Sequence, residues 1–263
     1  TQKMKSFIVT GIISVIMTVL IGNVFPEESQ QAKIRESSKV AKDHNQENQV
    51  NYGTQKGNVL IDFSDYTGGS VYTWLESKGF CFTSETKDPG IIELSANEDE
   101  LIVKARQPTR VFIFNDSVNL KEFSKVRIEW GIIQYPKDAS YEKKNNNEAL
   151  MVYIFFGDVR LSSGCLFVPD SPYFIGLFLS KKDKINKPYT GRCFEEGGRF
   201  VCLGNPESGE TVISEFDLYR AFQTYFQDAV PAISGISLEV DTSSSGDGGN
   251  AGAFIKRIEF LSK

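Results

Sequence analysis

The feature that most constrains this chain is a succession of short runs of β-branched and aromatic residues separated by turn residues. Over residues 125–133 apolar residues alternate with Arg127, Glu129 and Gly131, as in a strand with one solvated face. Residues 150–156 are apolar on both faces, which is typical of a central strand covered on both sides. The predicted strands cover residues 80–83, 91–95, 101–105, 111–115, 125–133, 149–156, 174–180, 198–203, 236–241 and 253–261. This pattern predicts an all-β fold, a jelly-roll-like β-sandwich with one or two short helices.

Two segments depart from the strand pattern. Residues 71–77 predict a short helix that ends at Gly79. Ser214 is the expected cap of a second helix, with Glu215 and Asp217 near its positive end. Apolar and aromatic residues at helical spacing then run from 218 to 226. Packing against the sandwich is the favoured role of that aromatic stripe, over contact with a cofactor.

An uncharged apolar run over residues 7–21 stands near the start of the chain. Lys3 and Lys5 precede this run, and Glu27 and Glu28 follow it, so the rest of the chain is expected to cross a membrane. The length fits both alternatives for residues 1–26, a cleaved signal peptide or an N-terminal hydrophobic helix that stays as a membrane anchor. The domain is therefore expected outside the cytoplasm, in the periplasm or at the cell surface, either membrane-anchored or secreted.

Residues 27–58 are rich in Gln, Asn, Ser, Lys and Glu and are predicted to form a disordered linker. A tether of this length favours the anchor, and it leaves residues 59–263 for the β-sandwich domain. The only histidine of the 263 residues, His44, lies in this linker. A histidine-dependent triad or histidine-rich zinc site in the folded domain is therefore not expected. The net charge of −5 argues against nucleic acid as a partner.

The spacing of two cysteines predicts a disulfide. If Gly197 and Gly198 form a two-residue hairpin loop, Cys193 and Cys202 lie directly opposite each other on paired strands. An oxidising compartment would favour this bridge, whereas a longer loop would leave two free thiols. Cys81 and Cys165 lie in apolar surroundings and are interpreted as small buried hydrophobic residues.

A loop rich in Asp, Ser and Gly follows the predicted strand 236–241. Asp241 and Asp247, with the hydroxyls of Ser243 and Ser245 between them, resemble the first half of a calcium-binding loop. Gly252 stands where the closing bidentate acid would be required. A solvated strand connection is the favoured alternative, and no other cofactor is expected.

A second polar loop, over residues 135–148, carries tyrosine, asparagine, lysine and acidic residues that could bind a glycan. Aromatic rings can pack on sugar faces, and amide and charged groups can bond sugar hydroxyls. The candidate ligand-binding residues in and near this loop are Tyr135, Tyr141, Asn147, Glu148, Tyr173, Tyr189 and Arg192. Hydrolysis of a polysaccharide would instead require two carboxylates across a cleft, for which Glu129, Glu148 and Glu239 are candidates without a distinguishable pair.

Several stretches resemble a bacterial family catalogued as domain of unknown function 3047. They include Ile128-Glu-Trp-Gly-Ile-Ile-Gln-Tyr-Pro136 and continue through residues 147–156, 219–222, 233–242 and 253–260. The resemblance implies an exported sandwich of galactose-binding-like shape, without an established activity or catalytic residues. Members often carry Asp-Thr-Asp-Asn where this chain has Asp241-Thr-Ser-Ser, which weakens the expectation of a metal there.

Three functions remain as hypotheses. The leading one is a non-catalytic binding domain for an envelope or extracellular glycan. The alternatives are a carboxylate-dependent enzyme acting on polysaccharide and a structural subunit of a cell-envelope complex. The membrane is an expected partner through residues 1–26 if this segment is not cleaved.

Overall fold

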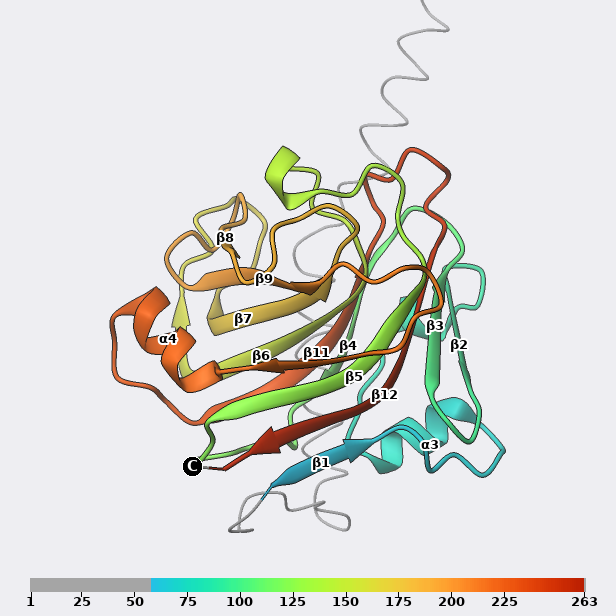
Figure 1. Ribbon diagram of the computed structural model, residues 1–263, viewed down its shortest axis with the longest axis horizontal. Coiled ribbons are helices and arrows are strands. Elements are labelled where there is room, and N and C mark those ends of the chain that lie inside the picture. The colour runs from blue at the N-terminus through green and yellow to red at the C-terminus, as the bar shows by residue number, and fades with distance from the viewer. Residues whose placement is uncertain (1–57, 263) are drawn as a thin grey trace, which may run out of the picture. The chain divides into compact units, whose positions relative to one another are not determined.

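The computed structural model describes residues 58–262, which fold into two β-sheets (Figure 1). The predicted export segment lies outside this range, as does all of the predicted linker except Asn58. Among the residues described, none belongs to a helix long and apolar enough to span a membrane.

The first sheet, here sheet A, has the strand order β10-β5-β12-β3-β2, and β1 also pairs with β12. All of its pairs are antiparallel. Its strands are β1 (Val59–Asp62), β2 (Ile92–Ala96), β3 (Leu101–Ala105), β5 (Lys125–Gln134), β10 (Val212–Phe216) and β12 (Ala251–Leu261). Because β12 is long, one of its edges pairs with β3 over residues 251–255 and with β1 over residues 257–260.

The second sheet, here sheet B, has the order β4-β11-β6-β7-β9-β8. Its strands are β4 (Arg110–Asn115), β6 (Glu148–Leu161), β7 (Ser171–Leu179), β8 (Pro188–Tyr189), β9 (Gly198–Gly204) and β11 (Ile233–Asp241). Strands β7 and β9 are parallel, and the other pairs are antiparallel. The predicted central strand is confirmed, because β6 lies between β11 and β7 and is buried from Glu148 to Ile154.

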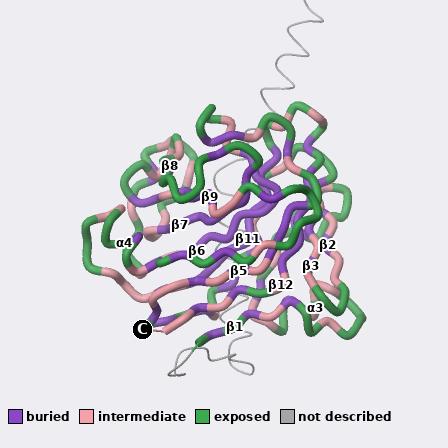
Figure 2. Tube along the Cα trace, viewed as in Figure 1, coloured by how far each residue is buried: buried purple, intermediate pink, exposed green. Residues whose placement is uncertain are grey.

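The two sheets share one hydrophobic core. Ile128 and Trp130 of β5 belong to the same buried cluster as Val152 of β6 and Leu238 of β11. Buried positions accordingly follow the strands of both sheets, and exposed positions gather in the connecting loops (Figure 2). The predicted all-β sandwich is confirmed at the level of two packed sheets, and the finer jelly-roll assignment stays a prediction.

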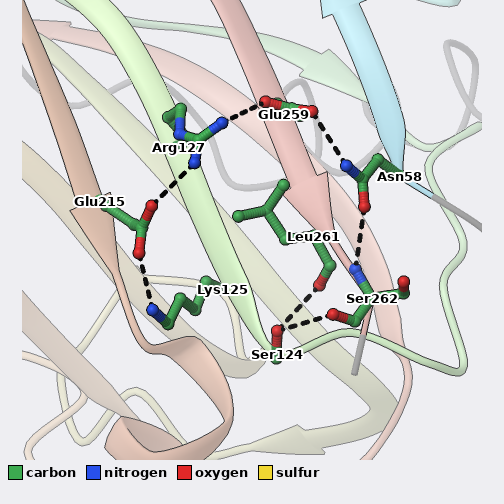
Figure 3. Close-up of polar contacts among 8 residues, drawn as sticks. All are labelled: Asn58, Ser124, Lys125, Arg127, Glu215, Glu259, Leu261 and Ser262. Carbon is green, nitrogen blue, oxygen red and sulfur yellow. Dashed lines mark hydrogen bonds and ion pairs between the residues drawn. The ribbon is translucent and has the colours of Figure 1, made fainter.

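The outer surface of sheet A carries charged cross-strand pairs instead of a second apolar layer. Arg127 of β5 donates to Glu215 of β10 at 3.0 Å and to Glu259 of β12 at 3.1 Å. Lys125 extends this row through Glu215, and Asn58 extends it through Glu259 (Figure 3). Opposite charges on neighbouring strands stabilise such a surface modestly and keep it solvated. This arrangement confirms the predicted polar face at Arg127 and Glu129, whereas Gly131 on the same face is buried.

Both predicted helices are present, but the start predicted for the second one is wrong. Helix α3 (Val71–Ser77) is capped by Ser70, and helix α4 (Leu218–Phe226) is capped by Asp217, whose side chain accepts from the Arg220 N–H. Ser214 lies in β10 and accepts a hydrogen bond from the buried Trp130 indole at 3.0 Å. Ser214 and Glu215 therefore belong to the end of strand β10, and Asp217 alone caps helix α4.

The predicted strand at 80–83 and the environments of two cysteines also need correction. Residues 80–83 form only an isolated bridge between Cys81 and Phe114. Cys81 is exposed, so it is not a buried hydrophobic residue. Cys165 is not one either, because it forms a disulfide with Cys193 across 28 residues of sequence.

The predicted Cys193–Cys202 bridge is wrong because Gly197 and Gly198 do not form a hairpin loop. The Gly198 N–H donates to the Phe194 carbonyl, which closes a turn just before β9. Strand β9 then pairs with β7 and β8, so Cys202 has no strand opposite it that carries Cys193. Cys202 is a buried free thiol.

Within residues 58–262, the other helical segments are two 3₁₀ turns, η2 (Glu85–Lys87) and η3 (Tyr141–Lys143). The second of these turns lies within the predicted ligand-binding loop.

Candidate functional site: an acidic cluster beside a cavity

A register irregularity brings an acidic residue of β6 to the outer face of sheet B. Glu239 of β11 pairs with Met151, but Asp241 pairs with Glu148, so the ladder is shifted between these two positions. Ala149 and Leu150 both belong to the hydrophobic core as a result. Irregularities of this kind redirect a side chain. Here Glu148 joins Glu239 and Asp241.

The three carboxylates form a compact buried group. One ligand atom from each of Glu148, Glu239 and Asp241 lies within 4.8 Å of those of the other two. Arg110 on β4 lies at the edge of the group, with its Nε 2.6 Å from Glu239 Oε1 and 3.4 Å from Asp241 Oδ2. Arg110 pairs directly with Asp241 in the sheet register, which explains why its guanidinium reaches both acids.

The charges in this group are not balanced within the described residues. The Glu239 side chain is 1% exposed, and its Oε2 has no hydrogen-bond partner among those residues. Burial, with the neighbouring charges of Glu239 and Asp241, raises the pKa of Glu148 well above its usual value. Burial and Glu239 also raise the pKa of Asp241. Three acids thus share one ion-paired arginine.

Aromatic residues hold Glu148 from one side. The Tyr141 hydroxyl in η3 donates to Glu148 Oε2 at 2.8 Å, and the Tyr141 ring stacks on Phe178 at a centroid distance of 4.3 Å. Tyr153 and Phe200 belong to the same cluster, which covers the outer face of sheet B beside the acids. Burial and the Glu148 carboxylate raise the pKa of Tyr141 well above its usual value, so this hydroxyl remains a donor.

A cavity of about 300 Å³ lies next to this group. Tyr135, Asn147 and Glu148, which the sequence singled out, all line it, and Ala139 and Lys182 are also part of its wall. Its walls therefore offer amide, carboxylate, ammonium and aromatic groups. The polar groups are already oriented, because the Tyr135 hydroxyl donates to the Pro206 carbonyl and Asn147 accepts from the Ser244 N–H.

Other sequence-predicted residues lie elsewhere. Tyr173 packs against Phe222 and Phe226 of helix α4, and its hydroxyl contacts Asp228 at 3.4 Å. Arg192 is exposed beside the disulfide, and its carbonyl oxygen lies 3.7 Å from the Cys165 sulfur. Neither residue lines the cavity.

Tyr189 also does not line the cavity, although it packs against Tyr141. Its hydroxyl donates to Glu142 at 2.9 Å. Tyr189 therefore supports the η3 turn.

The loop after β11 uses its oxygens mainly for its own turns. Asp241 accepts from the N–H and hydroxyl of Ser243, and Asp247 accepts from the Ser245 hydroxyl. Asp247 is not a member of the acidic group that contains Asp241. A calcium site made by Asp241 and Asp247 stays a prediction.

The three candidate catalytic carboxylates do not share one surface. Glu129 lies on sheet A, where it forms an ion pair with Arg257 at 2.8 Å. Glu148 and Glu239 are neighbours on sheet B. Sequence reasoning missed this pairing because strict alternation from Leu150 places Glu148 on the core side. It also missed Arg110, for which the only signal was a cation at the start of a strand.

No family model matches the chain, so its resemblance to domain of unknown function 3047 stays a prediction. No curated protein matches it either.

Several solved structures match over much of the described sandwich. The agarase AgWH50C has a TM-score of 0.36 and 10% identity over 79% of this chain, which spans 25% of the agarase. A family 29 carbohydrate-binding module has a TM-score of 0.28 and 9% identity, covering 64% of this chain and 76% of the module. The potassium-bound carbohydrate recognition domain of Emp46p has a TM-score of 0.32 and 10% identity, covering 68% and 92%. Similarity at these TM-scores does not assign a function to the chain.

Proposed function

We propose that this protein is a non-catalytic glycan-binding domain that acts outside the cytoplasm and holds its ligand in the cavity beside Glu148. The observation that carries the proposal is that Tyr135, Asn147 and Glu148 line one cavity of about 300 Å³. This volume is at the lower end of the range for small-molecule sites, which run from roughly 300 to 1,000 Å³. A short stretch of a glycan, with one or two rings inserted, is the ligand that such a cavity would suit.

The chemistry of the walls supports a polyhydroxylated ligand. Sugar hydroxyls both donate and accept hydrogen bonds, so they suit a site that offers carboxylate acceptors, ammonium donors and an amide. Lys137, Lys181 and Lys182 are exposed at the wall, and Glu148 is buried within it. The buried acid would select neutral sugar hydroxyls, while the lysines would favour a glycan that also carries acidic groups nearby.

A cavity-filling variant tests the proposal. Ala139 lines the cavity and is half-buried, so Ala139→Trp should fill the space without entering the hydrophobic core. The matched control is Ala229→Trp, at an exposed position that does not line the cavity. The full chain and both variants would be applied to a glycan array and measured by titration calorimetry.

We expect the wild-type chain and Ala229→Trp to bind the same glycan class. Ala139→Trp should bind it more weakly by on the order of tenfold or more, which corresponds to at least about 1.4 kcal/mol. No binding to any glycan class would refute the function. Equal binding by Ala139→Trp would refute this location for the site.

A polysaccharide-active enzyme is the second candidate, because carboxylate atoms of Glu148 and Glu239 lie within 4.8 Å. Retaining glycosidases use two carboxyl groups about 5–5.5 Å apart. Glu239, however, is almost completely buried and is held by Arg110, which leaves it poorly placed to attack a substrate. Release of reducing ends from a bound polysaccharide, and its loss in Glu148→Gln, would favour the enzyme over the binding domain.

A further inference from the structure

We propose that Glu148, Glu239 and Asp241 form a binding site for a calcium ion on the outer face of sheet B. The three residues come from two neighbouring strands and meet because of the register shift between β6 and β11. This site shares Glu148 with the wall of the cavity proposed to hold the glycan, and it differs from the loop site formed by Asp241 and Asp247.

The spacing of the carboxylates matches the coordination sphere of calcium. Calcium binds oxygens at about 2.3–2.6 Å, so two ligands on opposite sides of one ion lie about 4.6–5.2 Å apart. The ligand atoms of Glu148, Glu239 and Asp241 all lie within 4.8 Å of one another. A single ion placed among them can therefore reach all three. Magnesium usually keeps several waters and is bound through one or two carboxylates, so three protein carboxylates favour calcium.

An unpartnered oxygen provides a second, independent indication of a ligand. Glu239 Oε2 is buried and has no hydrogen-bond partner in the described part of the chain, whereas Oε1 of the same carboxylate is bound by Arg110. Buried polar atoms in native proteins are almost always paired, because a lone buried acceptor loses its hydration without compensation. A cation beside Glu239 Oε2 supplies the missing partner.

The charges lead to the same conclusion. When all three acids are ionised, as metal ligation requires, they and Arg110 carry a net charge of about −2, which one divalent cation would neutralise. The adjacent cavity opens onto Glu148, so water can complete the six to eight oxygen ligands that calcium takes.

Terbium luminescence provides a direct test, since Tb³⁺ occupies calcium sites and is sensitised by nearby tyrosines. The Tyr141 hydroxyl is 2.8 Å from Glu148 Oε2, and Tyr153 is buried in the adjoining aromatic cluster. The full chain, freed of metal with a chelator, would be titrated with Tb³⁺ and then with Ca²⁺ as competitor. Thermal unfolding with and without Ca²⁺ gives a readout that does not depend on luminescence.

Three variants locate the ion. Glu239→Gln and Glu148→Gln each remove one proposed ligand charge while keeping the shape of the side chain. Asp247→Asn is the matched control, because Asp247 lies in the adjoining loop but outside the acidic group. Circular dichroism of each metal-free variant establishes that it is folded before its affinity is compared.

We expect tyrosine-sensitised Tb³⁺ emission that Ca²⁺ displaces, and a melting temperature that rises with Ca²⁺ concentration. Glu148→Gln and Glu239→Gln should each weaken binding by on the order of tenfold or more, and Asp247→Asn should leave it unchanged. Absence of a Ca²⁺-dependent shift in the wild-type chain overturns the proposal. Binding that is lost in Asp247→Asn but kept in the two glutamine variants also overturns it, because the ion would then lie in the loop.

Discussion

Burial distinguishes the two free thiols that the structure describes. Cys81 is exposed beside Phe114, whereas Cys202 lies inside β9 with its side chain in the aromatic cluster of sheet B. Burial raises the pKa of the Cys202 thiol to about 11. The thiolate is the reactive form, so Cys202 is both shielded and protonated at neutral pH.

Thiol labelling should therefore discriminate between the two residues. Partial desolvation and the nearby Asp116 also raise the pKa of the Cys81 thiol. Because Cys81 is exposed, Ellman's reagent at pH 8 should still modify it in the native chain, whereas Cys202 should react only after denaturation, giving two thiols in total. Raising the pH towards 11 increases the thiolate fraction of Cys202, so its native labelling rate should rise with pH. Cys81→Ser is the control, and rapid labelling of this variant at pH 8 would contradict the buried placement of Cys202.

Only part of the candidate site could be predicted from individual residues of the sequence. The loop 135–148 was selected for its mixture of tyrosine, amide and acid, and three of its candidate binding residues, Tyr135, Asn147 and Glu148, line the cavity. The acidic group was not predicted, because Glu148 changes faces at an irregularity in strand pairing. Such a shift depends on how two distant strands align. A pattern of alternation within one strand does not contain that information.

At the scale of elements, the boundary between β10 and α4 depends on two side chains with different tasks. Ser214 closes the hydrogen bond of the buried Trp130 indole, and Asp217 caps the helix through the Arg220 N–H. Both are small polar residues just before a helical pattern, so composition alone favoured the wrong one as the cap.

Two substitutions should separate these tasks. Asp217→Ala should lower the free energy of unfolding by about 1 kcal/mol through loss of the cap. Ser214→Ala leaves a buried indole N–H without a partner and should cost about 1–3 kcal/mol. Urea unfolding measures both costs, and tryptophan emission should change in Ser214→Ala but not in Asp217→Ala. A tryptophan response to Asp217→Ala alone would contradict this assignment.

The features that the sequence did not predict lie mostly in loops and in the pairing of distant strands. The strong apolar runs matched strands β3, β5, β6 and β12 to within a few residues, because burial on a sheet imposes a local period. The Cys165–Cys193 bridge joins two irregular segments, and neither has a period that could have placed it. The predicted hairpin between Cys193 and Cys202 was wrong because β9 pairs in parallel with β7, and pairing between strands far apart in the sequence leaves no local pattern.

At the scale of the whole molecule, stability depends on the core shared by the two sheets. Ile255 of β12 is fully buried and pairs with Leu101 of β3 on one side and Trp130 of β5 on the other. Ile213 of β10, in the same sheet, is 66% exposed. The two isoleucines therefore have the same chemistry and opposite surroundings.

Truncation of these two side chains measures how much of the stability comes from this core. Ile255→Ala leaves a cavity between the sheets and should lower the free energy of unfolding by about 2–5 kcal/mol. Ile213→Ala removes a solvated side chain and should change it by less than about 0.5 kcal/mol. Urea denaturation of the full chain, followed by far-ultraviolet circular dichroism, gives both values. Equal losses in the two variants would mean that β10 and β12 are buried alike, which would contradict the solvated outer face of sheet A.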